Sequence, residues 1–400
     1  MTPDPVSLAR EPVPPLVPTV QPPSLPAPPA QAPVRVVTPS RRIKVVQFGP
    51  ALHTHGGITT VEQHICDYLA TYVSIRHVAT MDEGSKFGRA FLYARAVREL
   101  RRALASIDPC IVHIHFASRG SALRKMILAD MVTRAGRPLV LHAHGGYFDQ
   151  FHRRLPAVLR HTVDGILQRA DVLITLSSRW RDFYVNECEV SPSHVTVLPN
   201  PVHWTPDVPN RSGRSVVQFL FLGRMCQKKG TYDLVNAFAA LPDAVRARAR
   251  LTLAGDGDVE AIRKLAEPFG EQMRVLPWID SSERERLLAQ SDVFVLPSYH
   301  EGVPMALLEA MAAGLPAIVT PVGGIPDVLR TGVEGLMVEP ARVTELSAAM
   351  ARLVNQEGER IAYGRRAHER ARSYDVHGYA RSLAEIYQRI APVADYREIP

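Results

Sequence analysis

The sequence has few cysteines, and their spacing is that of neither a metal site nor a disulfide framework. The four, Cys66, Cys110, Cys188 and Cys226, are widely separated, and none forms a CxxC pair or a cysteine–histidine spacing typical of zinc. We therefore expect free thiols, no disulfide and no zinc.

Long apolar runs are absent as well. No segment reaches the roughly 18 uninterrupted apolar residues that a membrane-spanning helix needs. The N-terminal end also lacks the basic start and continuous apolar region of a secretory signal. No G-x-G-x-x-G fingerprint occurs, which argues against a dinucleotide oxidoreductase. The absence of a spanning segment and of a secretory signal indicates a cytoplasmic protein.

Glycine is missing from residues 1–40, which hold 13 of the 33 prolines. Such a composition cannot bury a core and favours extended chain, so we expect a disordered Pro-rich leader there. The chain as a whole has 400 residues and 46% apolar content, which is enough for two domains with sizeable cores.

Positive charge is concentrated in one half of the chain. Residues 41–200 hold 21 lysines and arginines against 13 acidic residues, whereas residues 201–400 hold 24 against 25. The excess suggests an anionic partner for the first half, such as a phosphorylated acceptor or an anionic membrane surface. Generic solubility is the alternative, and nothing points to nucleic acid.

Strand-like runs alternate with amphipathic stretches in both halves, which is typical of parallel βαβ units. The expected strands are Ile43–Phe48, Ile75–Ala79, Ile111–His115, Leu139–His142 and Val172–Leu176, then Val216–Leu222, Leu251–Ala254, Arg274–Leu276, Val293–Leu296, Ala317–Val319 and Leu336–Val338. We expect two α/β domains, residues 41–200 and 215–372, joined by a polar, Pro-rich linker, 201–214. Ligand should bind in the crevice between them, at the carboxyl ends of the strands.

Two carboxylates flank the start of a predicted helix that runs from Ala306 to Ala313. Glu301 and Glu309 lie eight positions apart, so one is on the loop before the helix and the other a little over two turns further. Four residues near the helix start offer backbone N–H groups to an anion: Val303, Met305, Ala306 and Leu307. A phosphate between two hydroxyl-binding carboxylates is the chemistry of a nucleotide sugar. The alternative is a buried helix with solvated ends.

Two further loops carry phosphate-binding chemistry. Arg224 and Lys229, on a glycine-bounded loop after a strand, can clamp a diphosphate from two directions. Gly255 lets backbone approach a ligand closely, although that signal is weak alone. An ordinary surface turn is the alternative for both loops.

The first half supplies a glycine pair and a histidine after its strands. Gly56 and Gly57 open a helix near Thr59 and can present amide groups to a phosphate. His144, on a glycine-flanked loop, can bond a sugar hydroxyl and sit near developing positive charge. A tight turn and a structural histidine are the respective alternatives.

These residues together resemble glycosyltransferase family 4, retaining enzymes of the GT-B architecture found in bacterial exopolysaccharide and cell-surface glycan assembly. The resemblance covers about residues 43–390. It rests on the Glu-x7-Glu stretch from Glu301 and on the segments 197–201, 221–230, 314–319 and 323–328. Asp327 departs from the family, which commonly carries glutamate there. The resemblance implies two Rossmann-like domains facing a cleft, with a C-terminal helix, residues 373–390, that packs back on the N-terminal domain before a tail, 391–400.

The resemblance also implies a role for each motif. Arg224 and Lys229 would bind the donor diphosphate, Glu309 the ribose, Glu301 the donor sugar, and His144 would contact the sugar near its reacting face. Arg224, Lys229, Glu301 and His144 are thus the expected catalytic residues. The wider donor-binding set adds Gly57, Gly255, Trp278, Gly302, Val303, Met305, Ala306 and Leu307.

Retention in this family is usually explained by front-face attack, in which the leaving phosphate takes the acceptor proton. Neither a metal nor a cofactor is then expected beyond the nucleotide-diphosphate sugar. The function implied is hexosyl transfer to a glycan or lipid-linked acceptor. Two alternatives stay open, a non-hydrolysing nucleotide-sugar epimerase and an inactive sugar-nucleotide-binding protein.

The acceptor side is expected in the basic half, after strand Ile111–His115. Arg119, Ser121, Arg124 and Lys125 would bind the phosphate of a polyprenyl-diphosphate acceptor, with Tyr147 nearby. Solvated cations on a capped helix are the alternative. Arginines at 95, 98, 101 and 102 could lie on an anionic bilayer, which would make the protein peripheral on the inner face of the plasma membrane. The alternative is that these arginines form the solvent-exposed face of a packed helix.

Overall fold

The computed structural model describes residues 42–106, 108 and 110–391. The expected Pro-rich leader, 1–40, and residues 392–400 of the expected tail lie outside this range. The range forms one compact unit with two parallel sheets.

The first sheet contains six parallel strands in the order β2-β1-β3-β4-β5-β6. Its strands are β1 (Lys44–Pro50), β2 (Ser74–Met81), β3 (Ile111–Phe116), β4 (Leu139–Ala143), β5 (Val172–Thr175) and β6 (Val195–Val197). The order reverses between β1 and β3, so the chain leaves the sheet to opposite sides there. Ligands of such sheets bind at that reversal.

The second sheet repeats the arrangement with six parallel strands in the order β12-β11-β10-β7-β8-β9. Its strands are β7 (Val217–Leu222), β8 (Ala249–Ala254), β9 (Met273–Leu276), β10 (Val293–Leu296), β11 (Ala317–Val319) and β12 (Gly335–Met337). Here β7 and β10 are neighbours. The loops that carry Lys229 and Glu301 follow these two strands and therefore meet.

All the expected strands are confirmed, with ends that differ by one or two residues. β6 was not expected, because a three-residue edge strand with a threonine at its centre has too few apolar positions to show a period. The helix after β10 begins at Met305 and ends at Ala312, one residue before the expected bounds.

Helices cover both faces of each sheet. Those of the first half are α1 (Gly57–Leu69), α2 (Lys86–Ala105), α3 (Gly120–Arg134), α4 (Phe148–Arg153), α5 (Ala157–Gln168) and α6 (Ser178–Asn186). Those of the second half are α7 (Thr231–Ala239), α8 (Asp243–Arg246), α9 (Val259–Ala266), α10 (Ser281–Gln290), α11 (Met305–Ala312), α12 (Ile325–Val328), α13 (Val343–Asn355), α14 (Glu357–Ala371) and α15 (Val376–Ile390). Four 3-10 turns complete the set: η1 (Pro192–His194), η2 (Gln227–Lys229), η3 (Glu267–Gln272) and η4 (Arg372–Tyr374).

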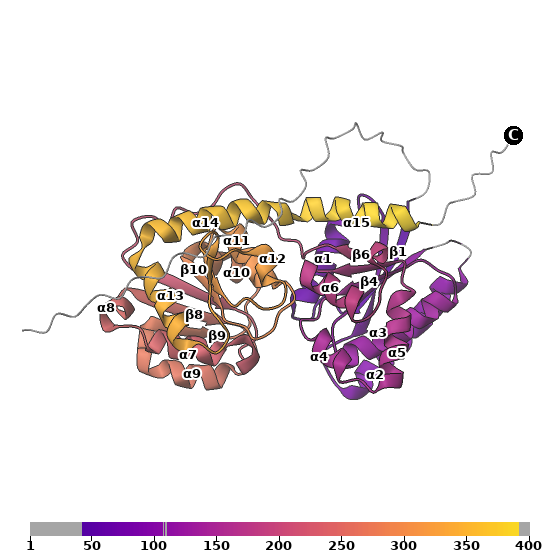
Figure 1. The fold of residues 1–400 in the computed structure, drawn as a ribbon, viewed down its shortest axis with the longest axis horizontal. Helices are drawn as coiled ribbons and strands as arrows, with labels where there is room; N and C mark the ends of the chain where they lie inside the picture. Colours follow the sequence, from indigo (N-terminus) through magenta and orange to yellow (C-terminus); the bar gives the residue numbers. More distant parts are fainter. Residues whose placement is uncertain (1–41, 107, 109, 392–400) are drawn as a thin grey trace, which may run out of the picture. The chain divides into compact units, whose positions relative to one another are not determined.

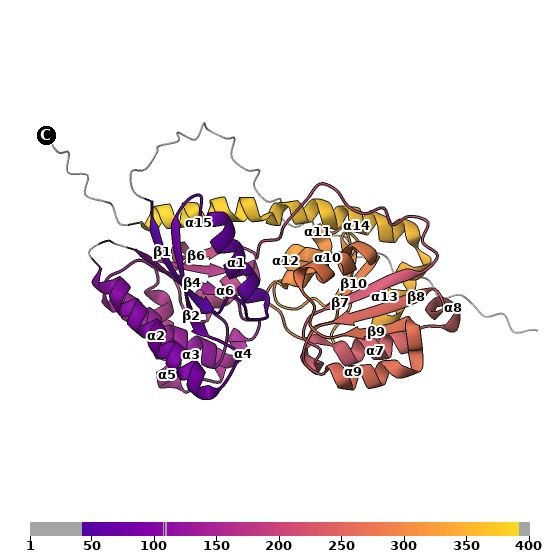
Figure 2. The ribbon, with the colours of Figure 1, turned by 180° about the vertical axis from the view of Figure 1, so that it is seen from behind.

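The C-terminal helix α15 packs on the first sheet, as expected. Tyr379, Leu383 and Tyr387 are buried in one apolar cluster with residues of β1, β3 and α1. Both ribbon views draw α15 alongside α1 (Figures 1 and 2). A helix from the end of the chain therefore completes the core of the first half.

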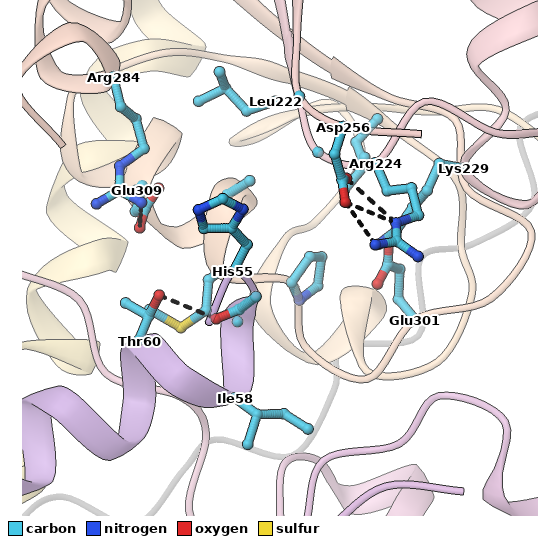
Figure 3. A pocket seen from close by; sticks show the side chains of 18 of the residues that line it. His55, Ile58, Thr60, Leu222, Arg224, Lys229, Asp256, Arg284, Glu301 and Glu309 are labelled. Carbon is cyan, nitrogen blue, oxygen red and sulfur yellow. Dashed lines mark hydrogen bonds and ion pairs between the residues drawn. The ribbon is translucent and has the colours of Figure 1, made fainter. Parts of the chain in front are cut away.

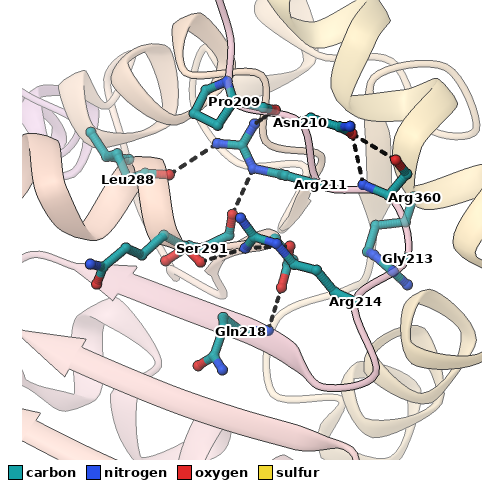
Figure 4. Close-up of polar contacts among 12 residues, drawn as sticks. Pro209, Asn210, Arg211, Gly213, Arg214, Gln218, Leu288, Ser291 and Arg360 are labelled. Atoms are coloured by element: carbon teal, nitrogen blue, oxygen red, sulfur yellow. Dashed lines mark hydrogen bonds and ion pairs between the residues drawn. The ribbon is translucent and has the colours of Figure 1, made fainter.

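The segment between the sheets is anchored to the second half by arginines (Figure 4). Arg211 is buried and donates to the carbonyls of Leu288 and Ser291 at 3.1 and 2.7 Å. These carbonyls lie at the end of α10, where the last turn of a helix leaves its acceptors without partners. Arg214 bonds Asp292 at 2.9 Å, and that carboxylate also accepts from the backbone of β7. The polar side chains of this segment thus hold it in a fixed position along the second half.

None of the described helices combines the length and apolarity that crossing a bilayer requires. The four cysteines all lie in the described part of the chain and are free thiols, as expected.

Candidate active site

A cavity of about 420 Å³ lies where the carboxyl ends of both sheets meet, at the strand-order reversal of each. Its walls come from the loops after β1 and β4 and from those after β7, β8, β9 and β10. The following residues of the expected set line it: Gly57, His144, Arg224, Lys229, Gly255, Trp278, Glu301, Gly302, Val303, Met305, Ala306 and Glu309. The cavity thus collects nearly every residue that the sequence singled out for the donor.

Glu301 and Lys229 form an ion pair on the wall of this cavity. Lys229 Nζ lies 2.6 Å from Glu301 Oε1, and Ser298 Oγ donates to the same oxygen at 2.7 Å. The carboxylate is buried, whereas the ammonium group is partly exposed. Its second oxygen, Oε2, has no hydrogen bond to another described residue and can accept one from a ligand hydroxyl.

Arg224 is also paired with a carboxylate. Its Nη2 donates to Asp256 Oδ2 at 2.5 Å, and its Nε contacts the same oxygen at 3.1 Å. This bidentate contact raises the pKa of Arg224 above its ordinary value. Asp256 holds the guanidinium over the cavity, on the same side as Lys229 and Glu301 (Figure 3).

Glu309 faces a third cation across the cavity from these pairs (Figure 3). Arg284 Nη1 of α10 lies 3.5 Å from Glu309 Oε1. Burial raises the pKa of Glu309, and the nearby Arg284 partly offsets this. The arginine therefore favours the ionised carboxylate that hydroxyl binding requires.

Helix N-termini from both halves present amides to the cavity. The N–H groups of Met305 and Ala306 in α11, and of Gly57 and Ile58 in α1, have no backbone or side-chain acceptor among the described residues. A Cβ on Gly57 would lie 3.3 Å from Met305 Cγ, so glycine allows the two termini to approach. Two positive helix ends thus converge where a diphosphate would fit.

Leu307 differs from the expectation. Its N–H donates to the Pro304 carbonyl at 3.2 Å, and its side chain is fully buried in the core of the second half. The 3-10-like start of α11 consumes this amide. Leu307 therefore does not line the cavity.

An aromatic pair closes one end of the cavity. The rings of His55 and Trp278 stack at 4.1 Å with an interplanar angle of 12°. They belong to the loops after β1 and β9. Gly255 lies beside this end, where its positive φ of 156° and a 1.9 Å clash for any Cβ with the Gly223 carbonyl require glycine.

Close contacts between the two halves fix the cavity floor. Asn200 Nδ2 donates to the Val303 carbonyl at 2.7 Å. A Cβ on Gly302 would lie 3.0 Å from the His144 carbonyl, so the two loops touch through backbone. Asp327 accepts from the Ser178 N–H at 2.6 Å, at the N-terminus of α6. Aspartate at this position thus has a role in holding the halves together.

His144 lines the cavity from the loop after β4. Its Nε2 lies 2.8 Å from His115 Nδ1. Burial and the proximity of Lys125 lower the pKa of His144 to about 3. The ring is therefore neutral over the physiological pH range and can exchange hydrogen bonds without carrying charge.

Two groups of side chains in the described part of the chain have metal-ligating chemistry. The nitrogens of His113, His115 and His142 lie within 4.8 Å of one another, as do ligand atoms of His152, Asp164 and Cys188. Both groups lie outside the cavity. The His113 ring stacks on the His115 and His142 rings at 29° and 7°, and the latter two rings are tilted by 34° to each other.

Two of the expected acceptor residues line a second hollow of about 290 Å³. Arg119 and Tyr147 are joined there by Gln150, Arg154, Gln227, Lys228, Tyr299 and His300. Three of these are cations and none is a carboxylate. Lys228 Nζ lies 5.0 Å from the centre of the Tyr147 ring. The hollow therefore favours an anionic group.

The other expected acceptor residues lie elsewhere. Lys125 is only 3% exposed and faces the first sheet, where burial lowers its pKa to about 7. Ser121 and Arg124 are half-buried on α3 and do not line the hollow. Arg119 precedes α3 with a φ of 55°, a strained value for a non-glycine residue.

Sequence reasoning missed Asp256, Arg284, Arg154 and Lys228. Lys228 lies inside the segment 221–230 and Asp256 directly follows Gly255, so their loops were singled out but their side chains were not. Arg284 lies on α10 and Arg154 directly follows α4, and neither stretch carries a motif. Only the fold brings them to the cavity and to the hollow.

The geometry agrees with comparisons to known proteins. A family model described as "Glycosyltransferase Family 4" matches residues 69–205, and one described as "Glycosyl transferases group 1" matches residues 217–356. The chain belongs to glycosyltransferase family 4. Together the two matches span the second sheet and all of the first except β1, with the cavity-lining loops after β4 and after β7 to β10. The enzyme is therefore a glycosyltransferase, and the epimerase alternative is set aside.

Curated relatives of this glycosyltransferase act on polysaccharides and lipid-linked sugars. A glycogen synthase of Mycobacterium tuberculosis is 29% identical over 299 residues, covering 70% of this chain and 68% of that protein. A UDP-Gal:alpha-D-GlcNAc-diphosphoundecaprenol alpha-1,3-galactosyltransferase of Escherichia coli is 26% identical over 271 residues, covering 62% of this chain and 67% of that protein.

Solved structures share the fold. Anabaena HepE in complex with UDP-glucose superposes with a TM-score of 0.69 at 16% identity, covering 87% of this chain and all of that chain. Sucrose-phosphate synthase from Thermosynechococcus elongatus gives a TM-score of 0.72 at 17% identity, covering 87% and 99%. The glycosyltransferase has the GT-B architecture, as expected.

Proposed function

We propose that this enzyme transfers a hexosyl group from a nucleotide-diphosphate sugar to a glycan or lipid-linked acceptor, with retention of anomeric configuration. The observation that carries the proposal is the cavity where Arg224, Lys229 and two helix N-termini surround one space. A diphosphate needs positive charge from several directions in a site sheltered from water. The setting would be bacterial cell-surface polysaccharide assembly, which the lipid-linked substrate named for the Escherichia coli relative favours.

The donor diphosphate would replace internal carboxylates as partner of the two cations. Without a ligand, Arg224 pairs with Asp256 and Lys229 with Glu301. Both cations are thus held in place, and little side-chain freedom is lost when a diphosphate binds. The free N–H groups of Met305 and Gly57 would complete the cradle.

The rest of the donor would follow the cavity to both sides of the diphosphate. Glu309, beside Arg284, would accept the ribose hydroxyls, and the base would lie against Trp278 and His55. On the other side, Glu301 would accept sugar hydroxyls, and His144 would contact the sugar near the reacting carbon.

We propose a front-face reaction for the transfer itself. The acceptor hydroxyl attacks the anomeric carbon on the face that the diphosphate leaves, and the departing phosphate oxygen takes the hydroxyl proton. The enzyme would supply positioning and stabilise the charge on the leaving group through Arg224, Lys229 and the α11 N-terminus. His144 is neutral and would act by hydrogen bonding.

Retention and metal independence have direct tests. Proton NMR of the product should show the anomeric configuration of the donor, and an inverted linkage would sink the front-face scheme. Activity should persist after extensive dialysis against chelator. Loss of turnover that magnesium restores would show that the leaving group needs a metal.

The acceptor would carry a phosphate, bound in the hollow of Arg119, Arg154 and Lys228 beside the donor cavity. Lys228 adjoins Lys229, so an acceptor phosphate there would lie near the donor sugar. A polyprenyl-diphosphate sugar has this chemistry, as the named substrate of the Escherichia coli relative does. The discriminating assay compares a lipid-diphosphate sugar with the same sugar lacking phosphate.

Helix α2 would bring the enzyme to the cytoplasmic face of an anionic membrane. Phe87 and Phe91 are 90% and 75% exposed, and Arg95, Arg98 and Arg102 continue the same helical stripe. Arg102 pairs with Glu99, which lowers its contribution. Flotation with acidic liposomes should fall for Phe87→Ser with Phe91→Ser. Val158→Ser, at another exposed apolar position, is the matched control.

The base and sugar of the donor are best found by a thermal-shift screen. Guanosine diphosphate mannose, uridine diphosphate glucose and uridine diphosphate N-acetylglucosamine are the candidates. One of them should raise the melting temperature, and the same donor should release nucleotide diphosphate when acceptor is added. A protein that none of these compounds stabilises would favour the alternative of an inactive scaffold.

A further inference from the structure

A buried polar cluster lies behind His144, between the first sheet and two helices. His113 and His115 point to one face of β3, and His142 is the register partner of His115 on β4. All three rings are at most 1% exposed. Helices α1 and α15 cover this face through the apolar cluster that they share with the sheet.

One line of contacts runs through this cluster from the C-terminal helix to the cavity. Tyr387 Oη on α15 lies 2.6 Å from His113 Nδ1. The His113 and His115 rings stack at 4.2 Å, and His115 Nδ1 lies 2.8 Å from His144 Nε2. We call Tyr387, His113 and His115 the histidine column.

Most other polar groups of the cluster have no hydrogen-bond partner in the described part of the chain. The hydrogen bonds of the cluster are therefore mainly those of the histidine column. The Glu62 oxygens, Lys125 Nζ and both His142 nitrogens make no hydrogen bond in the described part of the chain. Glu62 Oε1 lies 3.9 Å from His115 Nδ1, beyond hydrogen-bond distance. His142 touches His144 only through its ring face, at 4.1 Å.

We propose that the histidine column positions His144 for the transfer reaction, so that helix α15 contributes to the geometry of the active site. The inference rests on the proposed function for its kinetic part. A hydrogen bond to Nε2 and a stack against His142 together fix the plane of the His144 ring. The His144 ring, which lines the cavity, is then held in one orientation there. The column residues themselves do not line the cavity and act through His144.

A tyrosine pair on α15 provides a matched test. Tyr387→Phe removes only the hydroxyl that bonds His113. Tyr379→Phe removes a buried hydroxyl of the same helix that has no partner. The first substitution should lower kcat about tenfold with little change in donor KM, because misplaced reacting groups cost rate rather than binding. The second should leave kcat within about twofold of the unchanged enzyme.

Two substitutions of His115 test the link to His144. Asparagine places an amide where Nδ1 was, whereas glutamine places it near the position of Nε2. His115→Asn should therefore keep kcat close to that of the unchanged enzyme, and His115→Gln should lower it about tenfold. A nonspecific loss of packing would affect both alike.

Ring-nitrogen NMR of histidine-labelled protein gives a readout that needs no activity. The His144 signals, assigned by their loss in His144→Gln, should shift in Tyr387→Phe and His115→Gln and stay in place in Tyr379→Phe. The inference is overturned if the His144 signals and kcat of Tyr387→Phe and His115→Gln match those of the unchanged enzyme. If no nucleotide sugar is turned over, the proposed function fails, while the NMR comparison still decides the positioning.

Discussion

The two sheets have the same size and the same kind of strand order, yet they meet the cavity with opposite chemistry. The second half presents charges: Arg224, Lys229 and Arg284, each beside a carboxylate. The first half presents glycine amides and His144, whose pKa of about 3 keeps it neutral. Its charged groups at the cleft, Arg119 and Arg154, line the separate hollow.

The difference suggests a division of labour on one repeated scaffold. Charges held by internal ion pairs suit a diphosphate, which needs strong and pre-oriented electrostatic partners. Neutral groups backed by a buried cluster suit the reaction centre, where an added charge would compete with the developing one. Substitutions of the charged cavity residues in the second half should therefore abolish donor binding. Substitutions in the first half should instead change the KM for the acceptor or the kcat.

Removing Lys229 should have the largest effect. Lys229→Ala takes away one diphosphate cation and leaves Glu301 without its ion pair, so kcat/KM for the donor should fall about a thousandfold. Lys264→Ala, at an exposed position on α9, is the matched control and should leave turnover unchanged. Steady-state release of nucleotide diphosphate measures both. A drop below tenfold in Lys229→Ala would contradict the assignment of the diphosphate site.

Replacing Glu309 should weaken donor binding less. Glu309→Gln removes the negative acceptor for the ribose hydroxyls, so the Kd for nucleotide diphosphate should rise about 10- to 100-fold. Arg284 should remain near the site, and the melting temperature should change little. Calorimetric titration of nucleotide into both proteins gives the comparison.

The pH dependence of nucleotide binding should report the ionisation of the Glu309 carboxylate. Burial raises the pKa of Glu309, and binding needs its ionised form. The affinity should therefore reach its full value above this pKa and fall as the pH drops through it. This fall should begin at a higher pH than it would for a glutamate with an ordinary pKa. Glu309→Gln should lack this loss of affinity at low pH, which is the acid limb of the pH profile. An identical limb in the variant would assign the titration to another group.

A smaller and more selective effect is expected in the first half. Arg119→Ala should raise the KM for a phosphorylated acceptor about tenfold and leave donor KM unchanged. Arg134→Ala, at the other end of α3, is the control for loss of a surface cation. If the acceptor KM is the same in Arg119→Ala as in the unchanged enzyme, the phosphate of the acceptor binds elsewhere.

The sequence was sufficient for every described strand except β6 and for most of the donor cavity. Buried strands show as short apolar runs, and the residues after them converge because parallel strands end on one edge. The same logic accounts for the meeting of Lys229 and Glu301, since β7 and β10 are neighbours. The prediction that Leu307 binds the donor was wrong for a local reason, because its N–H donates a hydrogen bond within the tight first turn of α11.

Lys125 shows what linear proximity misses. It was grouped with Arg119 and Arg124 by charge, but it shares the helical face of Ala122, Met126 and Ala129, which is buried. The 3.6-residue period could have separated it from the others. The cations Arg154 and Arg284 had no such signal, because only the packing of whole helices brings them to the hollow and the cavity.

Calorimetric titration of the preferred nucleoside diphosphate into the unchanged enzyme, Lys229→Ala and Arg119→Ala tests the division between the halves most directly. The account predicts tight binding to the unchanged enzyme, equally tight binding to Arg119→Ala, and loss of measurable binding in Lys229→Ala. Equal weakening in both variants, or unaltered binding in Lys229→Ala, would contradict it.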